Sequence, residues 1–230
     1  MATRAGARRH QALSGRCRRL PQRLSQFITS MICQEKAATA LSSSNSPQDP
    51  LDLREGHSHL FRISCTMSHL ELTGWYWGAL TSIEARQILN QTTEGTFLIR
   101  DSSNPEYLLT LSVKTSSGPA HLRIEYNEGK FGFDSVVLAK PKLKNFEDVV
   151  DLIQHYVSLS KSAQTTHDQS IAPVTKDTVI HLKLTKPLYV ATPSLQHLCR
   201  IIINKSTKTI QELPLPTRLK EYLLEYPFRL

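Results

Sequence analysis

The sequence predicts an α+β domain, a central antiparallel sheet between two helices, followed by a small all-helical module. Three observations predict it. A capped amphipathic segment precedes several strand-like segments, a second amphipathic segment follows them, and two helical patterns separated by prolines end the chain. The 230 residues are enough for two such units.

Basic charge is concentrated at the N-terminus. The formal net charge is +8, and residues 1–30 contain seven arginines and no acidic residue, so the rest of the chain is near neutral. We interpret residues 1–59 as a disordered basic arm and linker, with a mitochondrial transit peptide as the alternative for residues 1–30 and Met31 as a possible second start. Because the excess charge lies in this arm, we expect no nucleic-acid partner.

No apolar run approaches the roughly 18 residues that a membrane helix needs, so we expect no membrane insertion. The cysteines Cys17, Cys33, Cys65 and Cys199 are scattered and form no C-x-x-C pair. This spacing favours free thiols in a reducing compartment, and therefore a cytoplasmic protein without a structural metal site. We expect no cofactor.

The first helices are marked by spacing and by caps. An amphipathic helix over residues 60–73 is predicted to pack on the next domain, which extends over residues 74–190. Residues 74–78, Gly-Trp-Tyr-Trp-Gly, contain both tryptophans and form a packing nucleus. Thr81 and Glu84 form a capping box that predicts a helix from Ser82 to Asn90. The apolar positions of the first helix are Leu60, Ile63, Met67 and Leu70.

The strand pattern follows this helix. Residues 95–100 contain a continuous apolar run and predict a central strand, whereas residues 107–114 and 121–126 alternate as half-buried strands do. A hairpin turn is expected at residues 128–129 and a closing strand at 179–184. Asn145 is the predicted N-cap of an amphipathic helix that includes Phe146, and residues 160–178 are interpreted as a loop.

One face of the predicted sheet is suited to an anion. Strand alternation places Arg100, Thr110 and Arg123 on the same face, beside the loop that contains Ser102 and Ser103. Two guanidinium groups, several hydroxyls and loop amides would suit a phosphate, which carries close to two negative charges and three acceptor oxygens.

The C-terminal module, residues 191–230, has more apolar surface than it can bury alone. A helix is predicted to begin at Thr192–Pro193, and a second helical stretch follows a Leu-Pro-Leu-Pro segment. About forty residues cannot cover this surface, so the module either docks on the first domain or is covered by a partner. The stripe on its first helix consists of Leu195, Leu198, Cys199, Ile202 and Ile203.

Two motifs in the first domain resemble a known family. Trp75-Tyr76-Trp77-Gly78, followed by the segment from Gly95 to Ser102, closely resembles the Src-homology-2 domain, which binds phosphotyrosine. The resemblance implies that Arg100 holds the phosphate at the bottom of a pocket and that Ser102 and Ser103 assist. Many members carry an arginine where Ser82 lies here, and we expect Arg123 to supply that charge.

The C-terminal module carries a second resemblance. Ser194-Leu195-x-x-x-Cys199-x-x-x-Ile203 is similar to the box that binds the Elongin B–Elongin C pair, and we include Leu198 in this surface. Residues 213–216 are similar to an element associated with Cullin-5, which implies cullin contacts through Leu213, Pro214, Leu215 and Pro216. From about residue 60 to the end, the chain resembles the suppressor of cytokine signalling family, in which a Src-homology-2 domain precedes a SOCS box. The ending 226–230 favours one branch of this family.

The resemblance implies an adaptor that is not an enzyme. It would bind tyrosine-phosphorylated cytokine receptors and link them to an elongin–cullin ubiquitin ligase. The alternative is a competitor that only masks receptor phosphotyrosines. A phosphatase or phosphotransfer enzyme is disfavoured because the chain has no Gly-rich phosphate loop, and because Cys199 and His197 point apart on a helix.

Overall fold

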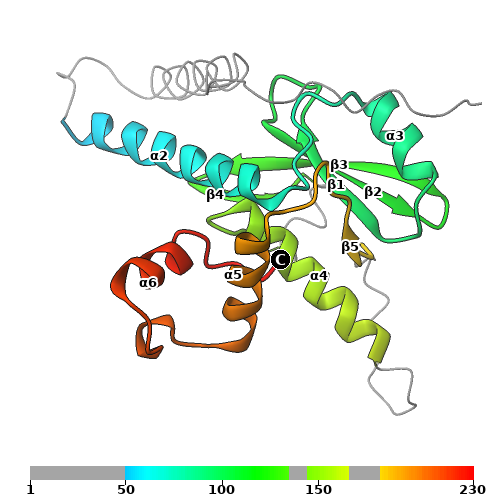
Figure 1. The fold of residues 1–230 in the computed structure, drawn as a ribbon. Helices are drawn as coiled ribbons and strands as arrows, with labels where there is room; N and C mark the ends of the chain where they lie inside the picture. Colours follow the sequence, from blue (N-terminus) through cyan, green and yellow to red (C-terminus); the bar gives the residue numbers. More distant parts are fainter. Residues whose placement is uncertain (1–49, 135–143, 166–181) are drawn as a thin grey trace, which may run out of the picture.

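The computed structural model describes residues 50–134, 144–165 and 182–230 (Figure 1). The predicted basic arm, up to residue 49, and most of the predicted loop 160–178 lie outside these ranges. The elements in chain order are α2 (Pro50–Thr73), α3 (Ser82–Asn90), β1 (Thr96–Asp101), β2 (Leu109–Thr115), β3 (Gly118–Asn127), β4 (Lys130–Phe133), α4 (Val149–Thr165), β5 (Lys186–Pro187), α5 (Leu195–Ser206), the 3₁₀ turn η2 (Ile210–Glu212) and α6 (Thr217–Leu224).

The centre of the molecule is a five-stranded sheet of order β4-β3-β2-β1-β5. Strands β1 to β4 are antiparallel, and α3 and α4 lie on opposite faces of the sheet (Figure 1). The β3–β4 turn contains Glu128 and Gly129, both with positive φ, as the predicted hairpin requires. The predicted α+β architecture is confirmed.

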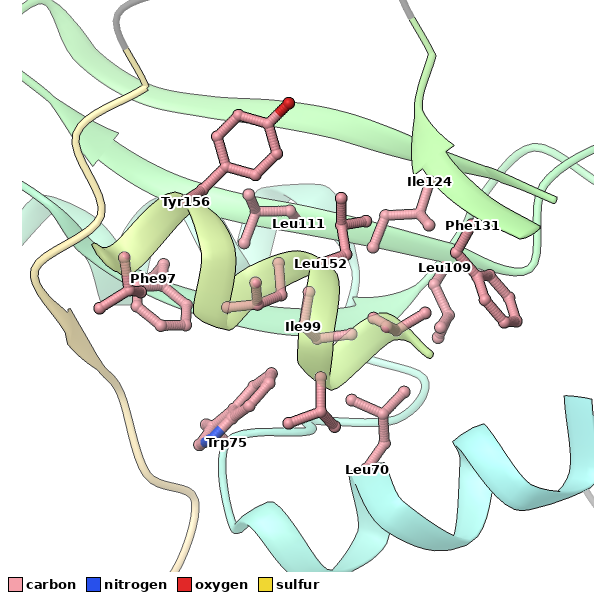
Figure 2. Close-up of a cluster of buried hydrophobic side chains, with 14 of the residues drawn as sticks. Leu70, Trp75, Phe97, Ile99, Leu109, Leu111, Ile124, Phe131, Leu152 and Tyr156 are labelled. Carbon is pink, nitrogen blue, oxygen red and sulfur yellow. The ribbon is translucent and has the colours of Figure 1, made fainter. Parts of the chain in front are cut away.

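The main core lies between the sheet and α4. Leu152 and Tyr156 of α4 face the apolar side chains of β1 and β2, while Leu70 of α2 and Trp75 close one end (Figure 2). Trp75 is fully buried and packs edge-on against Phe97, with ring centroids 5.8 Å apart. A large apolar side chain buried in this way contributes about 1.5–3 kcal/mol to folding.

Helix α2 begins at Pro50, ten residues before the predicted start at residue 60. Residues 50–59 are therefore helical, not linker. Proline suits the first helical turn because the N–H that it lacks has no acceptor there. The polar composition of residues 50–59 gave no sign of a helix in the sequence. The helix contacts the sheet through His59, whose Nδ1 lies 2.9 Å from the Tyr126 hydroxyl.

Helix α4 begins later than predicted, and Asn145 is not its cap. Phe146 pairs with Phe131 through two backbone hydrogen bonds of 2.6 and 2.8 Å, so this residue is extended. The helix begins after Asp148, whose Oδ1 accepts a 2.7 Å hydrogen bond from the amide of Val150. Asp148 Oδ2 also accepts from Thr66 and lies 2.8 Å from Nδ1 of His69, which connects α2 to this helix end.

The closing strand is β5, which lies downstream of the predicted residues 179–184. Of those residues, 182–184 are irregular and the others lie outside the described ranges. The amide of Leu184 is taken by Ser160 Oγ on α4 at 2.9 Å, so it cannot join the sheet. Thr185 and Leu188 instead donate to the carbonyls of Gly95 and Phe97, parallel to β1.

Helix α5 is capped by Ser194, not by Thr192 as predicted. The Ser194 side chain accepts a 3.2 Å hydrogen bond from the amide of His197. The preceding residues are irregular where they pass close to Gly74: Val190 donates to the Gly74 carbonyl, and a Cβ at Gly74 would lie 3.4 Å from the Pro193 ring. The helix can begin only after this contact ends.

The C-terminal module docks on the first domain. Its last residues return to the main core, where Tyr226 and Phe228 are buried together with Ile201 of α5. The His69 ring of α2 lies edge-on to Phe228 at 5.0 Å between centroids. Part of the module therefore packs on the first domain, as one of the two expectations held, while Leu195 remains 77% exposed.

Candidate functional site

Three predicted site residues form a row across the sheet. Arg100 on β1 is directly opposite Thr110 on β2, and Thr110 is directly opposite Arg123 on β3. Because residues directly opposite each other on neighbouring strands share a face, all three lie on one side of the sheet, the side that α3 covers. The face predicted from strand alternation is therefore confirmed.

This row lies at a pocket of about 360 Å³ between the sheet, the loop after β1 and the start of α3. The pocket is lined by all five residues that the sequence selected as phosphate ligands. Its other lining residues are Ser82, Asn104, His121, Leu122 and Asp134.

Arg100 lies at the base of the pocket and is only 3% exposed. Its Nε donates to Ser112 Oγ at 3.1 Å, and its Nη1 donates to the Asp101 carbonyl at 2.9 Å and approaches Ser103 Oγ at 3.5 Å. Burial lowers the pKa of Arg100 below its usual value, but a guanidinium remains protonated in proteins. The base of the pocket is therefore a buried cation.

The neighbouring carboxylate of Asp101 forms no ion pair with Arg100, although its charge acts to raise the Arg100 pKa. Asp101 follows Arg100 in β1, so its side chain leaves the opposite face of the strand, where it accepts a hydrogen bond from the Tyr76 hydroxyl. Burial and this hydrogen bond raise the pKa of Tyr76, which keeps the hydroxyl protonated as the donor. A buried charge without an ion-pair partner favours an incoming anion.

The loop after β1 brings two hydroxyls to the pocket. Ser102 is buried and its Oγ accepts a 3.2 Å hydrogen bond from the amide of Asn104, which holds the loop in a tight turn. Ser103 is exposed and lies above Arg100. Hydroxyls and amides at this position are donors for the oxygens of a tetrahedral anion.

Sequence reasoning missed Ser112 and His121. Ser112 Oγ accepts from Arg100 and lies 2.9 Å from Nδ1 of His121, its cross-strand neighbour. Burial, with Arg100 and Arg86 nearby, lowers the pKa of His121. Its Nε2 is buried without a hydrogen-bond partner among the described residues. Strand alternation could have identified both residues, because it places Ser112 on the same face as Thr110 and His121 on the same face as Arg123.

Arg123 differs from Arg100 in its surroundings. Its side chain is 52% exposed, and its Nη1 lies 3.9 Å from Asp134 Oδ2. Its guanidinium lies over the Tyr107 ring, 5.2 Å from the centroid, and the Tyr107 hydroxyl donates to the same Asp134 oxygen at 2.9 Å. The pocket therefore has one fixed and one loosely held guanidinium.

A second concave surface lies between α5 and α6 in the C-terminal module. It is an apolar groove of about 450 Å³. Leu195, Cys199 and Ile203 line it from α5, at successive helical turns. The remaining lining residues are Gln196, Arg200, Leu215, Leu219, Tyr222 and Leu223.

The buried side of α5 carries Ile201 and three polar residues, His197, Arg200 and Asn204. Arg200 is 3% exposed; its Nη1 donates to the Tyr222 carbonyl at 3.1 Å, and its Nη2 lies 2.9 Å from His197 Nδ1. Asn204 Nδ2 donates to the Tyr226 carbonyl at 2.7 Å. These hydrogen bonds fix the C-terminal tail and turn the apolar stripe of α5 outward.

The residues that line the groove are not the same set as the predicted elongin-binding residues. Leu198 is exposed but does not line the groove, whereas Leu215, assigned with the cullin element, does. Leu213, Pro214 and Pro216 lie in the turn between η2 and α6 and line neither concave surface.

Comparisons with known proteins identify two domains in the chain. The SH2 domain family model matches residues 75–156, and the SOCS box model matches residues 191–224. The fold and these matches define a protein that joins a phosphotyrosine-binding SH2 domain to a SOCS box.

The relatives identify the family. "Suppressor of cytokine signaling 2" of Homo sapiens is 55% identical over 168 residues, which cover 73% of this chain and 82% of that protein. "Cytokine-inducible SH2-containing protein" is 49% identical in Gallus gallus, covering 77% and 75% of the two chains, and 41% identical in Bos taurus, covering 92% and 89%. The chain belongs to the suppressor of cytokine signalling family, and its relatives include the cytokine-inducible branch that residues 226–230 favoured.

None of the described helices is both long and apolar enough to cross a membrane. Within the described ranges, no three or more His, Cys, Asp and Glu side chains are grouped so that they could hold a metal ion. Cys65 and Cys199 are free thiols.

Proposed function

We propose that this protein is a cytoplasmic phosphotyrosine-binding adaptor that lowers cytokine receptor signalling through the JAK–STAT route. Its SH2 domain binds tyrosine-phosphorylated cytokine receptors. Its SOCS box recruits Elongin B, Elongin C and Cullin-5, so that the bound receptor is ubiquitinated. The chain contributes no catalytic residue and needs no cofactor, because recognition and recruitment are both binding events.

The observation that carries the proposal is the buried guanidinium of Arg100. Its Nε and Nη1 are held by Ser112 and by the Asp101 carbonyl, which leaves Nη2 without an acceptor among the described residues. A guanidinium held in this way presents a rigid fork to a phosphate. Because Arg100 lies at the pocket base, a phosphate must be carried on a long side chain to reach it, which favours phosphotyrosine over phosphoserine.

The other pocket residues complete this ligand set. The hydroxyls of Ser102, Ser103 and Thr110 donate to phosphate oxygens, and Arg123 adds a second charge from the pocket rim. Arg123 thus supplies the cation that other SH2 domains place early in the first helix, where this chain has Ser82 at the pocket edge.

The apolar groove supports the recruiting role. Leu195, Cys199 and Ile203 are spaced to insert into a groove or helix surface of Elongin C, and Leu198 extends this contact outside the concave part. Leu213, Pro214, Leu215 and Pro216 form the cullin-directed element. Docking of the tail leaves Leu195 and Ile202 more than half exposed, so a partner is needed to cover them.

The competitor that only masks receptor phosphotyrosines is the second candidate, and it needs the pocket but not the groove. We would measure receptor half-life after cytokine stimulation in cells that carry the wild-type chain or the variant Leu195→Ala/Cys199→Ala. The variant should keep phosphopeptide binding, lose Elongin binding and slow receptor turnover.

Leu224→Ala is the control, because Leu224 is 44% exposed on α6 but does not line the groove. It should clear the receptor at the wild-type rate. If the double variant does the same, recruitment through this groove is not the mechanism. If turnover slows while signalling remains fully suppressed, masking is the dominant action.

A further inference from the structure

Asp134 places a carboxylate in a pocket that is otherwise suited to an anion. It follows β4 directly and lines the same pocket as Arg100 and Arg123. Its backbone amide donates to the Arg123 carbonyl at 3.0 Å, so its position beside β3 is fixed by the hairpin. A negative charge here opposes the binding of a phosphate, which carries close to two negative charges itself.

The carboxylate has two contacts of different strength. Asp134 Oδ2 accepts a hydrogen bond from the Tyr107 hydroxyl at 2.9 Å, but it lies 3.9 Å from Nη1 of Arg123. A charge-assisted hydrogen bond between a guanidinium and a carboxylate is about 2.7–2.9 Å long. The tyrosine therefore holds the carboxylate by a short hydrogen bond, while the ion pair between the carboxylate and Arg123 is loose.

We propose that Asp134 sets the affinity of the pocket by competing with phosphate for Arg123, and that the Tyr107 hydroxyl weakens this competition. In the empty pocket Arg123 is shared between the Asp134 carboxylate and the Tyr107 ring. Ligand binding exchanges the ion pair for a contact between Arg123 and phosphate. This inference rests on the proposed phosphotyrosine binding, and it assigns opposite effects to two side chains that touch each other.

The direction of each effect follows from the contacts. Asp134→Asn keeps an acceptor for Tyr107 but removes the charge, so Arg123 is released and phosphate is no longer repelled. Tyr107→Phe keeps the ring under Arg123 but removes the donor, so the carboxylate is free to close on Arg123. If this cluster had only a structural role, both variants would change the affinity for the phosphotyrosine peptide in the same direction.

The test uses the full chain and one phosphotyrosine peptide selected by an array screen of the wild-type protein. In calorimetric titrations Asp134→Asn should bind about two- to fivefold more tightly, the range expected for release of a partly exposed ion pair. Tyr107→Phe should bind about two- to fivefold more weakly. In an Arg123→Gln background the gain from Asp134→Asn should be clearly smaller, because only the direct repulsion between Asp134 and phosphate is then relieved.

The proposal is overturned if Asp134→Asn binds with wild-type affinity or more weakly, if both single variants shift in the same direction, or if the gain is undiminished in the Arg123→Gln background. Arg100→Lys is measured in parallel. If Arg100→Lys abolishes binding while Asp134→Asn has no effect, only this inference fails. If Arg100→Lys itself binds like the wild type, the proposed phosphotyrosine function fails.

Discussion

The hydroxyl of Ser112 accepts a 3.1 Å hydrogen bond from Nε of Arg100, across the pair of strands β1 and β2. The same hydroxyl lies 2.9 Å from Nδ1 of His121 on β3. The direction of the guanidinium is therefore set by two neighbouring strands as well as by its own. Arg100 and Ser112 are buried, and His121 lines the pocket beside them.

Loss of this hydroxyl should weaken phosphopeptide binding. In Ser112→Ala, Nε of Arg100 loses its acceptor and the guanidinium is no longer aimed at the pocket mouth. A net hydrogen bond contributes about 0.5–1.5 kcal/mol, so we expect affinity to fall by about two- to twelvefold. Isothermal titration calorimetry with a phosphotyrosine peptide measures this fall in affinity. Ser158→Ala is the control, because Ser158 is exposed and bonds only within α4; equal affinities for both variants would show that Ser112 does not position Arg100.

His121 should make stability fall in mild acid. Burial and the nearby cations Arg100 and Arg86 lower the pKa of His121 in the folded state, whereas the unfolded chain keeps a value near 6.5. The unfolded state then binds more protons below about pH 6.5, so the free energy of unfolding decreases as the pH falls from 7 through the folded-state pKa. The contribution of neutral His121 to the free energy of unfolding is therefore fully present only above the pKa that this residue has in the unfolded chain.

His121→Asn tests this assignment. The side-chain amide of the asparagine takes the place of the His121 Nδ1 beside Ser112, but it does not titrate. Urea unfolding at several pH values between about 7 and 5 should show a smaller loss of stability with acid in the variant than in the wild type. Parallel pH profiles for the two proteins would mean that His121 is not the titrating group. Arg86→Gln, which removes one of the nearby cations, should leave most of the slope in place.

The local parts of this architecture could be predicted from the sequence. Thr81 and Glu84 form the predicted capping box, with hydrogen bonds in both directions. Alternation in β2 and β3 brought Thr110 and Arg123 to the same face as Arg100. These features depend on neighbours a few residues apart or on strand periodicity, which a sequence displays directly.

The features that the sequence could not show depend on distant partners. Asn145 is a good N-cap by type, but pairing of Phe146 with Phe131 moves the helix start to Asp148. Asp134 enters the pocket only because the hairpin length and register place it beside Arg123. On α5, periodicity suggests that the apolar stripe is buried, yet contacts with the C-terminal tail bury the polar residues His197, Arg200 and Asn204 instead.

The C-terminal tail should stabilise both domains together. Phe228 is 4% exposed and its ring lies 5.0 Å from those of His69 and Tyr226. Phe228→Ala leaves a cavity in the shared core and should lower the free energy of unfolding by about 3–5 kcal/mol. Both tryptophans of the chain, Trp75 and Trp77, report on the first domain, so denaturant unfolding followed by their fluorescence measures the effect.

Pro227→Ala is the comparison, because Pro227 is exposed in the same tail. It should unfold close to the wild type. If Phe228→Ala leaves the tryptophan-monitored transition where it was, the tail does not contribute to the stability of the first domain, and the two units unfold independently.

Titration of a phosphotyrosine peptide into the wild type and Arg100→Lys tests most directly whether Arg100 holds the phosphate. Lysine keeps the charge but loses the planar fork that Ser112 and the Asp101 carbonyl hold in place. Breaking a desolvated charged contact costs about 2–5 kcal/mol, so the dissociation constant should rise roughly thirtyfold or more. The unphosphorylated peptide should bind neither protein. Comparable dissociation constants for the wild type and Arg100→Lys would contradict the assignment of this pocket as the phosphotyrosine site.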